Sequence, residues 1–134
     1  MFFAEVRKQY QYKIENHEKF STEARMYHEM DLKYKMKCIN KPIMICDYKE
    51  DGYTKNIKRV FKDNPYGHYA YFKEILEQHD MQGVSFKKRL YVIKHYILFS
   101  YLTKQYKMKN IKGMKNKMIY ILLFIPGIIK SYYF

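Results

Sequence analysis

Apolar positions recur at helical spacing in three parts of the chain. Residues 22–34 place methionine and tyrosine side chains at three- and four-residue steps, which predicts a helix with one buried face and with Ser21 or Thr22 as its cap. Residues 64 to about 79 continue such a stripe, with Asn64 as the cap and Pro65 in the first turn. Ser85 is expected to open a third helix. The chain is therefore predicted to be mostly helical.

The stretch between the first two helices has a different character. Residues 36–48 read "MKCINKPIMICDY", in which β-forming side chains are interrupted by Lys41-Pro42. We expect two short strands here, followed by a turn at Asp51-Gly52. The predicted fold class is α/β, as an α+β fragment in which amphipathic helices follow two or more short strands. The strand-forming positions are Cys38, Ile39, Ile43, Ile45 and Tyr48.

The helix expected after Ser85 is amphipathic and basic. Its apolar side chains fall on one side, and most of its cationic side chains fall off that side. We expect the basic side chains to face a membrane surface. The apolar positions are Phe86, Leu90, Ile93, Ile97 and Tyr101, and the basic positions are Lys87, Lys88, Arg89, Lys94 and Lys104.

An apolar run, "MIYILLFIPGII" at residues 118–129, lies near the end of the sequence and is broken by Pro126-Gly127. It is too short to span a bilayer, which needs about 20 apolar residues in a helix. Two interpretations remain open. The run could lie in a membrane interface with the aromatic residues after it at headgroup depth, or it could pack as a helix on the body of a larger domain.

The positive charge is concentrated in the last part of the chain. The net charge is +13, and residues 81–134 hold eleven basic side chains and no acidic ones. Such a segment attracts phosphate, either in nucleic acid or in anionic lipid headgroups, although a solvated surface is the simple alternative. The N-terminus lacks the apolar stretch of a signal peptide, and we interpret Cys38 and Cys46 as reduced core residues of a cytoplasmic protein.

Candidate chemistry is sparse. There is no Gly-rich phosphate loop, nucleophile elbow or metal-spaced cluster of His or Cys, and the five scattered histidines are interpreted as surface or core residues. Glu23 is the exception, because backbone N–H groups and the helix dipole hold a carboxylate in the first turn of a helix. It could take a proton from a hydroxyl group, or it could serve only to cap the helix.

The order of short motifs adds a resemblance. Residues 17–57, "HEKFSTEARMYHEMDLKYKMKCINKPIMICDYKEDGYTKNI", resemble the region after the catalytic centre in bacterial family 2 glycosyltransferases of the GT-A fold. Helices such as "NPYGHYAYFKE" and "KKRLYVIKHYILFSYL" commonly follow in enzymes that build capsule and other surface polysaccharides. The matching positions are Glu18, Lys19, Phe20, Thr22, Glu23, Lys33 to Lys35, Tyr48, Asp51, Gly52, Thr54 and Asn56.

This resemblance implies a domain organisation and a reaction. Residues 1–62 would be the C-terminal, acceptor-side part of the catalytic domain, and residues 63–134 a basic helical tail at the membrane. Glu23 would be the base that deprotonates the acceptor hydroxyl, which attacks the anomeric carbon of a nucleotide-sugar with inversion. A divalent metal, Mg or Mn, would neutralise the leaving diphosphate in the complete enzyme. Thr22, Glu18, Lys19, Asp51 and Gly52 would support the acceptor side.

Two features depart from the family pattern. His17 stands where the family often has Gly, and Ala24 follows Glu23 where a second acidic residue is frequent. The nucleotide-binding half of such enzymes carries an Asp-x-Asp metal motif, which does not occur in this sequence. We therefore expect this chain alone to bind no metal and transfer no sugar, and we expect the missing N-terminal half as a partner, for which a separate chain is one form.

The implied partners are a nucleotide-sugar, a glycan or lipid-linked acceptor, and an anionic membrane surface. The expected location is cytoplasmic, peripheral at the inner face of the cell membrane. Two other functions stay open on the sequence alone. One is a small basic protein that binds nucleic acid or membrane without catalysis, and the other is a non-catalytic remnant or interaction module that folds poorly.

Overall fold

The computed structural model describes residues 4–11, 13–35, 37, 39–42, 44–47, 50, 52–78 and 81–124. Helices dominate this part of the chain, which contains no β-strand. The mostly helical character is therefore confirmed, whereas an α/β sheet is not seen in these ranges. The elements are α1 (Ala4–Lys8), α2 (Glu23–Asp31), α3 (Ile57–Asp63), α4 (Pro65–Gln78), α5 (Phe86–Thr103), the 3₁₀ turn η1 (Met108–Asn110) and α6 (Met114–Leu123).

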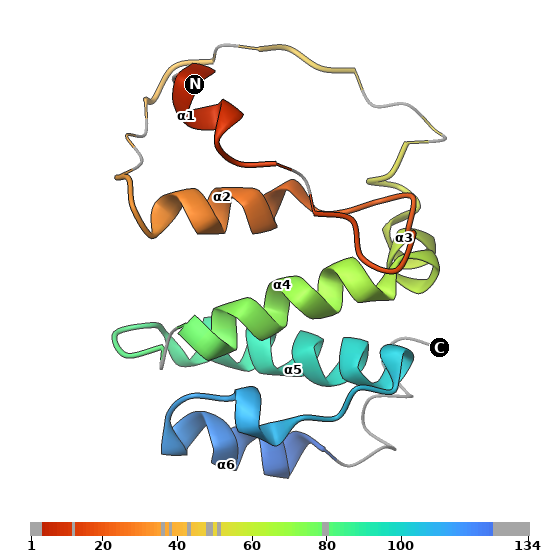
Figure 1. Ribbon diagram of the computed structural model, residues 1–134, viewed down its shortest axis with the longest axis vertical. Helices are drawn as coiled ribbons and strands as arrows, with labels where there is room; N and C mark the ends of the chain where they lie inside the picture. The colour runs from red at the N-terminus through yellow and green to blue at the C-terminus, as the bar shows by residue number, and fades with distance from the viewer. Residues whose placement is uncertain are drawn as a thin grey trace.

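The helices stack in layers (Figure 1). α4 and α5 form a hairpin with the most extensive contact between any two of the described elements, and α6 packs on the opposite side of α5. α2 lies on the other side of α4, and α3 meets the start of α4. α4 and α5 are thus the two inner helices of the stack. No helix among the described residues has both the length and the apolar composition needed to cross a membrane.

The main core is built around α5. Ile93, Tyr96 and Phe99 are fully buried on α5, as is Leu76 on α4. The predicted apolar stripe is confirmed at Ile93 and Ile97, but it is wrong at two positions, because Phe86 is 66% and Tyr101 is 49% exposed. The reason is that α5 has helices on two sides, so that more than one of its faces is buried. The buried cluster comprises Tyr69, Phe72, Leu76, Met81, Val92, Ile93, Tyr96, Ile97, Leu98, Phe99, Ile111 and Tyr120.

The predicted helix starts are confirmed at Thr22 and Ser85. The Thr22 hydroxyl accepts the N–H of Ala24 at 3.4 Å, and the Ser85 hydroxyl accepts the N–H of Lys88 at the same distance. α5 ends at Thr103, and the left-handed backbone of the next residue, Lys104 (φ 56°), lets its N–H reach back to the last turn. α2 is shorter than predicted, since it ends at Asp31. The domain boundary between residues 62 and 63 stays a prediction.

The two predicted strands are not formed in the described part of residues 37–47. Ile39, Met44 and Ile45 are 69%, 77% and 96% exposed, and Cys46 is exposed as well, so its assignment to the core is wrong. The physical reason is that a strand is stable only when its N–H and C=O groups pair with a neighbouring strand. No such neighbour exists among the described residues. Cys38, Ile43, Tyr48 and Asp51 lie outside the described residues.

Candidate functional site

The segment before α2 is fastened to the start of α4 by Glu18. Its two carboxylate oxygens accept the backbone N–H groups of Tyr66 and Gly67, each at 2.7 Å. These N–H groups belong to the first turn of α4, where donors have no partner within the helix. Burial raises the pKa of the Glu18 carboxyl, and the two backbone hydrogen bonds oppose that rise. Glu18 is therefore a tertiary cap of α4.

Asn64 makes the complementary connection. Its Oδ1 accepts the backbone N–H groups of Lys19 and Phe20, at 3.1 and 3.0 Å, and its Nδ2 donates to the carbonyl of Val60 at 3.1 Å. Asn64 directly precedes α4 as predicted, but its side chain fixes the 18–20 segment, while Glu18 takes the N–H groups of α4. The sequence reasoning missed this exchange because the partners are more than 40 positions apart.

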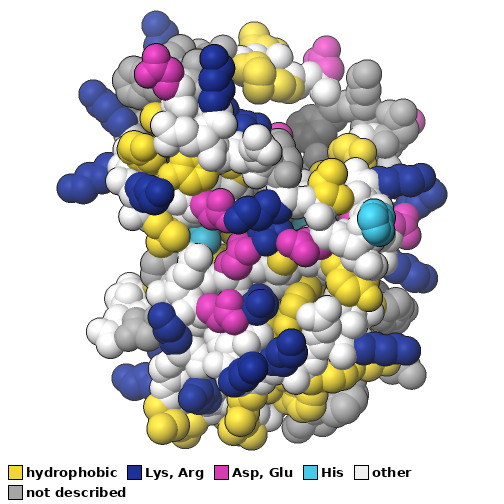
Figure 2. All heavy atoms as spheres, viewed as in Figure 1, with side chains coloured by type: hydrophobic (Ala, Val, Ile, Leu, Met, Phe, Trp, Pro, Cys, Tyr) yellow, Lys and Arg dark blue, Asp and Glu magenta, His cyan; other side chains and the backbone are white. Residues whose placement is uncertain are grey.

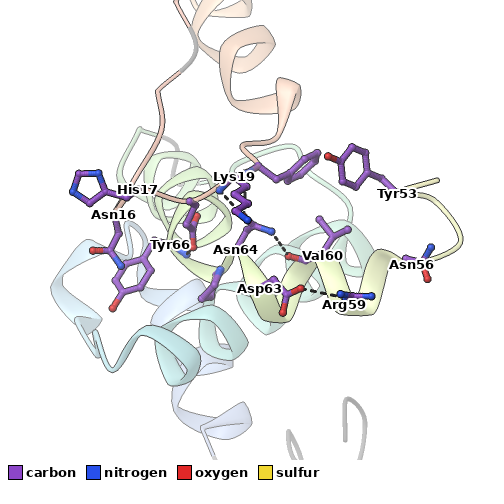
Figure 3. A pocket seen from close by; sticks show the side chains of 13 residues that line it. Asn16, His17, Lys19, Tyr53, Asn56, Arg59, Val60, Asp63, Asn64 and Tyr66 are labelled. Carbon is purple, nitrogen blue, oxygen red and sulfur yellow. Dashed lines mark hydrogen bonds and ion pairs between the residues drawn. The ribbon is translucent and has the colours of Figure 1, made fainter. Parts of the chain in front are cut away.

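A polar pocket of about 630 Å³ lies beside this junction (Figure 3). Arg59 and Asp63, one turn apart on α3, form an ion pair at 3.5 Å along its wall. The rings of Phe20 and Tyr53 meet at a centroid distance of 5.1 Å on another side. The pocket combines charged, amide and aromatic groups. It is lined by Asn16, His17, Glu18, Lys19, Phe20, Tyr53, Asn56, Arg59, Val60, Asp63, Asn64, Pro65 and Tyr66.

Glu23 occupies the first turn of α2, directly after its cap residue Thr22, and its side chain is exposed. The Tyr27 hydroxyl donates a hydrogen bond to Glu23 Oε2 at 3.0 Å, and this bond raises the pKa of the Tyr27 phenol. The carboxylate is thus oriented by the side chain of Tyr27, one turn further along the helix, through a hydrogen bond to Oε2. Such a group can accept a proton from a hydroxyl placed next to it.

A second pocket, of about 660 Å³, lies between α2, α4 and α5, and Glu23 itself lines neither pocket. Its lining includes Thr22 and Ala24, the two neighbours of Glu23, and it shares Phe20 with the polar pocket. We call it the aromatic pocket, because rings supply much of its wall. It is lined by Phe20, Thr22, Ala24, Tyr27, His28, Asp31, Ile57, Phe61, His68, Tyr71, Phe72, Ile75, Met81, Val84, Lys88, Tyr91 and Val92.

His68 is the buried titratable group of the aromatic pocket. Its ring stacks on Phe99 at 5.0 Å and meets Phe61 edge-on at 4.6 Å. Burial, with a smaller effect of His95, lowers the pKa of His68 to about 4, and burial also lowers the pKa of His95. Both histidines are therefore neutral near pH 7. The interpretation of the histidines as surface or core residues is confirmed for these two as core residues, which are only 6% exposed.

Arg25 is a structural residue that the sequence reasoning did not single out. Its buried guanidinium donates to Glu74 on α4, at 2.9 Å from Nε and 2.5 Å from Nη2, and to Glu15 at 2.8 Å. These bonds join α2 to α4 and to the segment before α2. The sequence offered one signal for this role, because Arg25 lies next to Met26 in the apolar stripe of α2. An arginine that is buried beside such a stripe requires acidic partners.

The structure gathers some of the predicted site residues and separates others. Glu18 and Lys19 line the polar pocket, and Thr22 lines the aromatic pocket beside Glu23. Gly52 precedes Tyr53 but lines neither pocket, and Asp51 lies outside the described residues. The basic residues of α5 are spread along that helix. Lys87, Lys88 and Lys104 are exposed, whereas Arg89 and Lys94 are half-buried, and Arg89 donates to the carbonyl of Met81 at 2.8 Å.

The described residues contain no group of three or more His, Cys, Asp or Glu side chains that could hold a metal ion. These residues do not fit the divalent metal that the resemblance implies, so no step through a metal is derived for this chain. Comparison with known proteins adds no assignment: no family model, curated protein or solved structure matches the chain.

Proposed function

We propose that this chain is the acceptor-side part of a glycosyltransferase of the family 2 type, with Glu23 as its catalytic base. The observation that carries the proposal is the position of Glu23. It is an exposed carboxylate in the first turn of α2, oriented by Tyr27, and its neighbours Thr22 and Ala24 line a pocket of about 660 Å³. A base must stand within reach of its proton donor, and a pocket beside it gives an acceptor hydroxyl a place to bind.

The proposed reaction transfers a sugar with inversion. Glu23 takes the proton of the acceptor hydroxyl as the oxygen attacks the anomeric carbon of a nucleotide-sugar, and the bond between that carbon and the diphosphate oxygen breaks. The electron pair of that bond leaves with the nucleoside diphosphate. Thr22 positions Glu23 by capping α2, and Glu18 and Lys19 shape the adjoining pocket wall. A divalent metal held by the nucleotide-binding half would neutralise the charge of the leaving diphosphate.

The proposal includes a partner half and a place in the cell. Donor positioning supplies much of the rate in such a reaction, so the chain acts together with a nucleotide-binding half, joined to it or separate. The exposed apolar side chains of Ile39, Met44 and Ile45 support this part of the proposal, because a sheet in that half would pair with and cover them. The acceptor is a glycan or a lipid-linked glycan of a surface polysaccharide such as a capsule, at the inner face of the cell membrane.

A transfer assay on two preparations tests the proposal. The first is the native assembly, isolated from the source cells through an affinity tag on this chain, and the second is the 134-residue chain purified alone. With a panel of nucleotide-sugars and Mg²⁺ or Mn²⁺, the native assembly is expected to form glycoside and the isolated chain is not. The proposal fails if the native assembly forms no glycoside from any donor. It also needs revision if the isolated chain forms product above a Glu23→Gln control.

A further inference from the structure

The outward face of α6 is apolar and exposed. Met114, Met118, Ile121 and Leu122 are 74%, 57%, 59% and 69% exposed. They are spaced by four, three and one residues, so they share one side of the helix. Four large apolar side chains in one exposed stripe form a contiguous patch, unlike single apolar residues scattered on a surface.

The opposite face of α6 is firmly attached to the molecule. Tyr120 is 5% exposed and its ring lies 6.1 Å from that of Tyr96 in the core. The fully buried Asn116 donates to the carbonyl of Lys112 at 2.8 Å, and the N–H of Lys112 donates to the carbonyl of Leu76 on α4 at 3.0 Å. The exposed stripe is therefore the outer side of a helix whose inner side is packed. The exposure does not come from a helix that stands away from the core.

Lysines are frequent on α6 and in the segment that leads into it. Figure 2 shows Lys and Arg side chains across the end of the molecule that α6 occupies in Figure 1, with hydrophobic side chains along its edge. In the described part of the chain none of these lysines forms an ion pair with a carboxylate, and residues 81–134 contain no acidic residue. The surface thus combines exposed apolar groups with uncompensated positive charge. The lysines are Lys104, Lys107, Lys109, Lys112, Lys115 and Lys117.

We propose that the outer face of α6 and these six lysines dock on the surface of an anionic phospholipid bilayer. Met114, Met118, Ile121 and Leu122 enter the boundary between headgroups and acyl chains, and the lysines contact the lipid phosphates. Charge complementarity favours an anionic surface over a neutral one. The side chains that project from the stripe are aliphatic, whereas binding of single-stranded nucleic acid uses exposed aromatic rings as stacking platforms. A bilayer therefore fits the surface better than RNA or DNA.

This inference rests on the proposed function, because that function requires the membrane to be the leaflet that carries the lipid-linked acceptor. The membrane-binding surface is then formed by α6 and not by α5, whose Ile93 and Ile97 are buried in the core. The assignment of Lys87, Lys88, Arg89 and Lys94 to a membrane contact is not needed for this docking.

Co-sedimentation of the full chain with vesicles tests the docking surface. We expect binding to vesicles of phosphatidylcholine with phosphatidylglycerol, weaker binding at higher salt, and little binding to phosphatidylcholine alone. The double substitution Ile121→Gln with Leu122→Gln is expected to weaken the binding about ten-fold or more. Its matched control is Ile39→Gln with Ile45→Gln, which removes two apolar side chains that are at least as exposed but lie elsewhere, and it is expected to leave binding unchanged.

A second pair of variants guards against an effect on folding. Met114→Gln with Met118→Gln is expected to weaken binding in the same direction, and far-UV circular dichroism of each unbound variant is expected to match that of the parent chain. Equal binding to neutral and anionic vesicles overturns the proposal, as does unchanged binding of both α6 variants. Salt-sensitive binding to single-stranded RNA without vesicle binding also overturns it and identifies a nucleic-acid surface. Transfer to a soluble acceptor by the native assembly is measured separately, so a failure of docking is distinguished from a failure of the proposed function.

Discussion

The carboxylate of Glu18 accepts the backbone N–H of Gly67 at 2.7 Å, although 49 positions separate the two residues in the sequence. Through this bond the segment before α2 caps the first turn of α4. The same segment carries Phe20, which lines both pockets, and Thr22, which caps α2 beside Glu23. The contact between Glu18 and α4 therefore sets the position of the proposed base relative to the pocket walls.

The substitution Glu18→Gln is expected to destabilise the fold. A glutamine has one acceptor oxygen where the carboxylate has two, so one of the N–H groups of Tyr66 and Gly67 loses its partner, and the favourable interaction of a negative charge with the helix N-terminus is lost. We expect a loss of about 1–2 kcal/mol in the free energy of unfolding, measured by urea denaturation. Glu77→Gln is the matched control, since the ion pair of Glu77 with Lys73 is long, at 3.8 Å, and partly exposed, and its loss is expected to stay below about 0.5 kcal/mol.

The substitution Gly67→Ala tests the same contact from the other side. A Cβ at this position lies 3.2 Å from Glu18 Oε2, closer than an ordinary contact. Alanine normally stabilises a helix interior by about 1 kcal/mol relative to glycine, but here it crowds the capping carboxylate. We expect Gly67→Ala to be clearly less favourable in the parent chain than in a Glu18→Ala background. Equal effects in the two backgrounds, measured by urea denaturation, would contradict the close contact.

Removing the guanidinium of Arg25 is expected to leave two carboxylates without their partner. Arg25→Met should lower the free energy of unfolding by about 3 kcal/mol, at the lower end for a broken buried pair because the Glu74 side chain is 21% exposed. The double variant Arg25→Met with Glu74→Leu is expected to recover part of this loss, because the uncompensated charge on α4 is gone. If the double variant loses as much free energy of unfolding as the two single variants together, Arg25 and Glu74 do not stabilise the fold through their mutual interaction.

Stability is expected to fall in mild acid because of His68. Its pKa is about 4 in the folded chain and about 6.5 when the chain is unfolded, so the unfolded state binds more protons between these values. The free energy of unfolding is therefore constant with respect to this group above pH 6.5 and decreases as the pH falls towards 4, by up to about 3 kcal/mol.

The variant His68→Phe isolates this contribution. Its ring can occupy the same place against Phe61 and Phe99, and it has no proton to bind. Urea denaturation at a series of pH values is expected to show a flatter profile for the variant between pH 6.5 and 4. Parallel profiles for the two proteins would contradict the burial of a neutral His68.

The helices α2, α4 and α5 could be predicted because their signals are local, whereas α1 and α3 were not predicted. The stripes of α2 and α4 and the caps Thr22 and Ser85 depend on residues within one or two turns of each other. Whether residues 36–48 form strands could not be predicted from local signals. A strand is stable only when it pairs with another strand, and its own sequence does not show whether such a partner is present. Propensity alone therefore predicted strands where the described residues are irregular and exposed.

The candidate site was only partly predictable for a similar reason. Thr22 and Glu23 follow from the rules of helix starts, and their places at the first turn of α2 are confirmed. The capping of α4 by Glu18 and the bonds from Arg25 to Glu74 join residues that lie 48 or 49 positions apart. Such long-range pairs depend on the packing of α2 against α4, which helix periodicity does not specify.

The most direct test of the account is the turnover number of sugar transfer by the native assembly with Glu23→Gln. Glutamine keeps the shape of the side chain but cannot accept the proton of the acceptor hydroxyl. We predict that kcat falls about 100-fold or more while the KM for the nucleotide-sugar stays nearly constant. The control Glu77→Gln is expected to leave both constants unchanged. A kcat for Glu23→Gln within about twofold of the parent assembly would contradict the role of Glu23 as the base and leave it as a residue of the helix start.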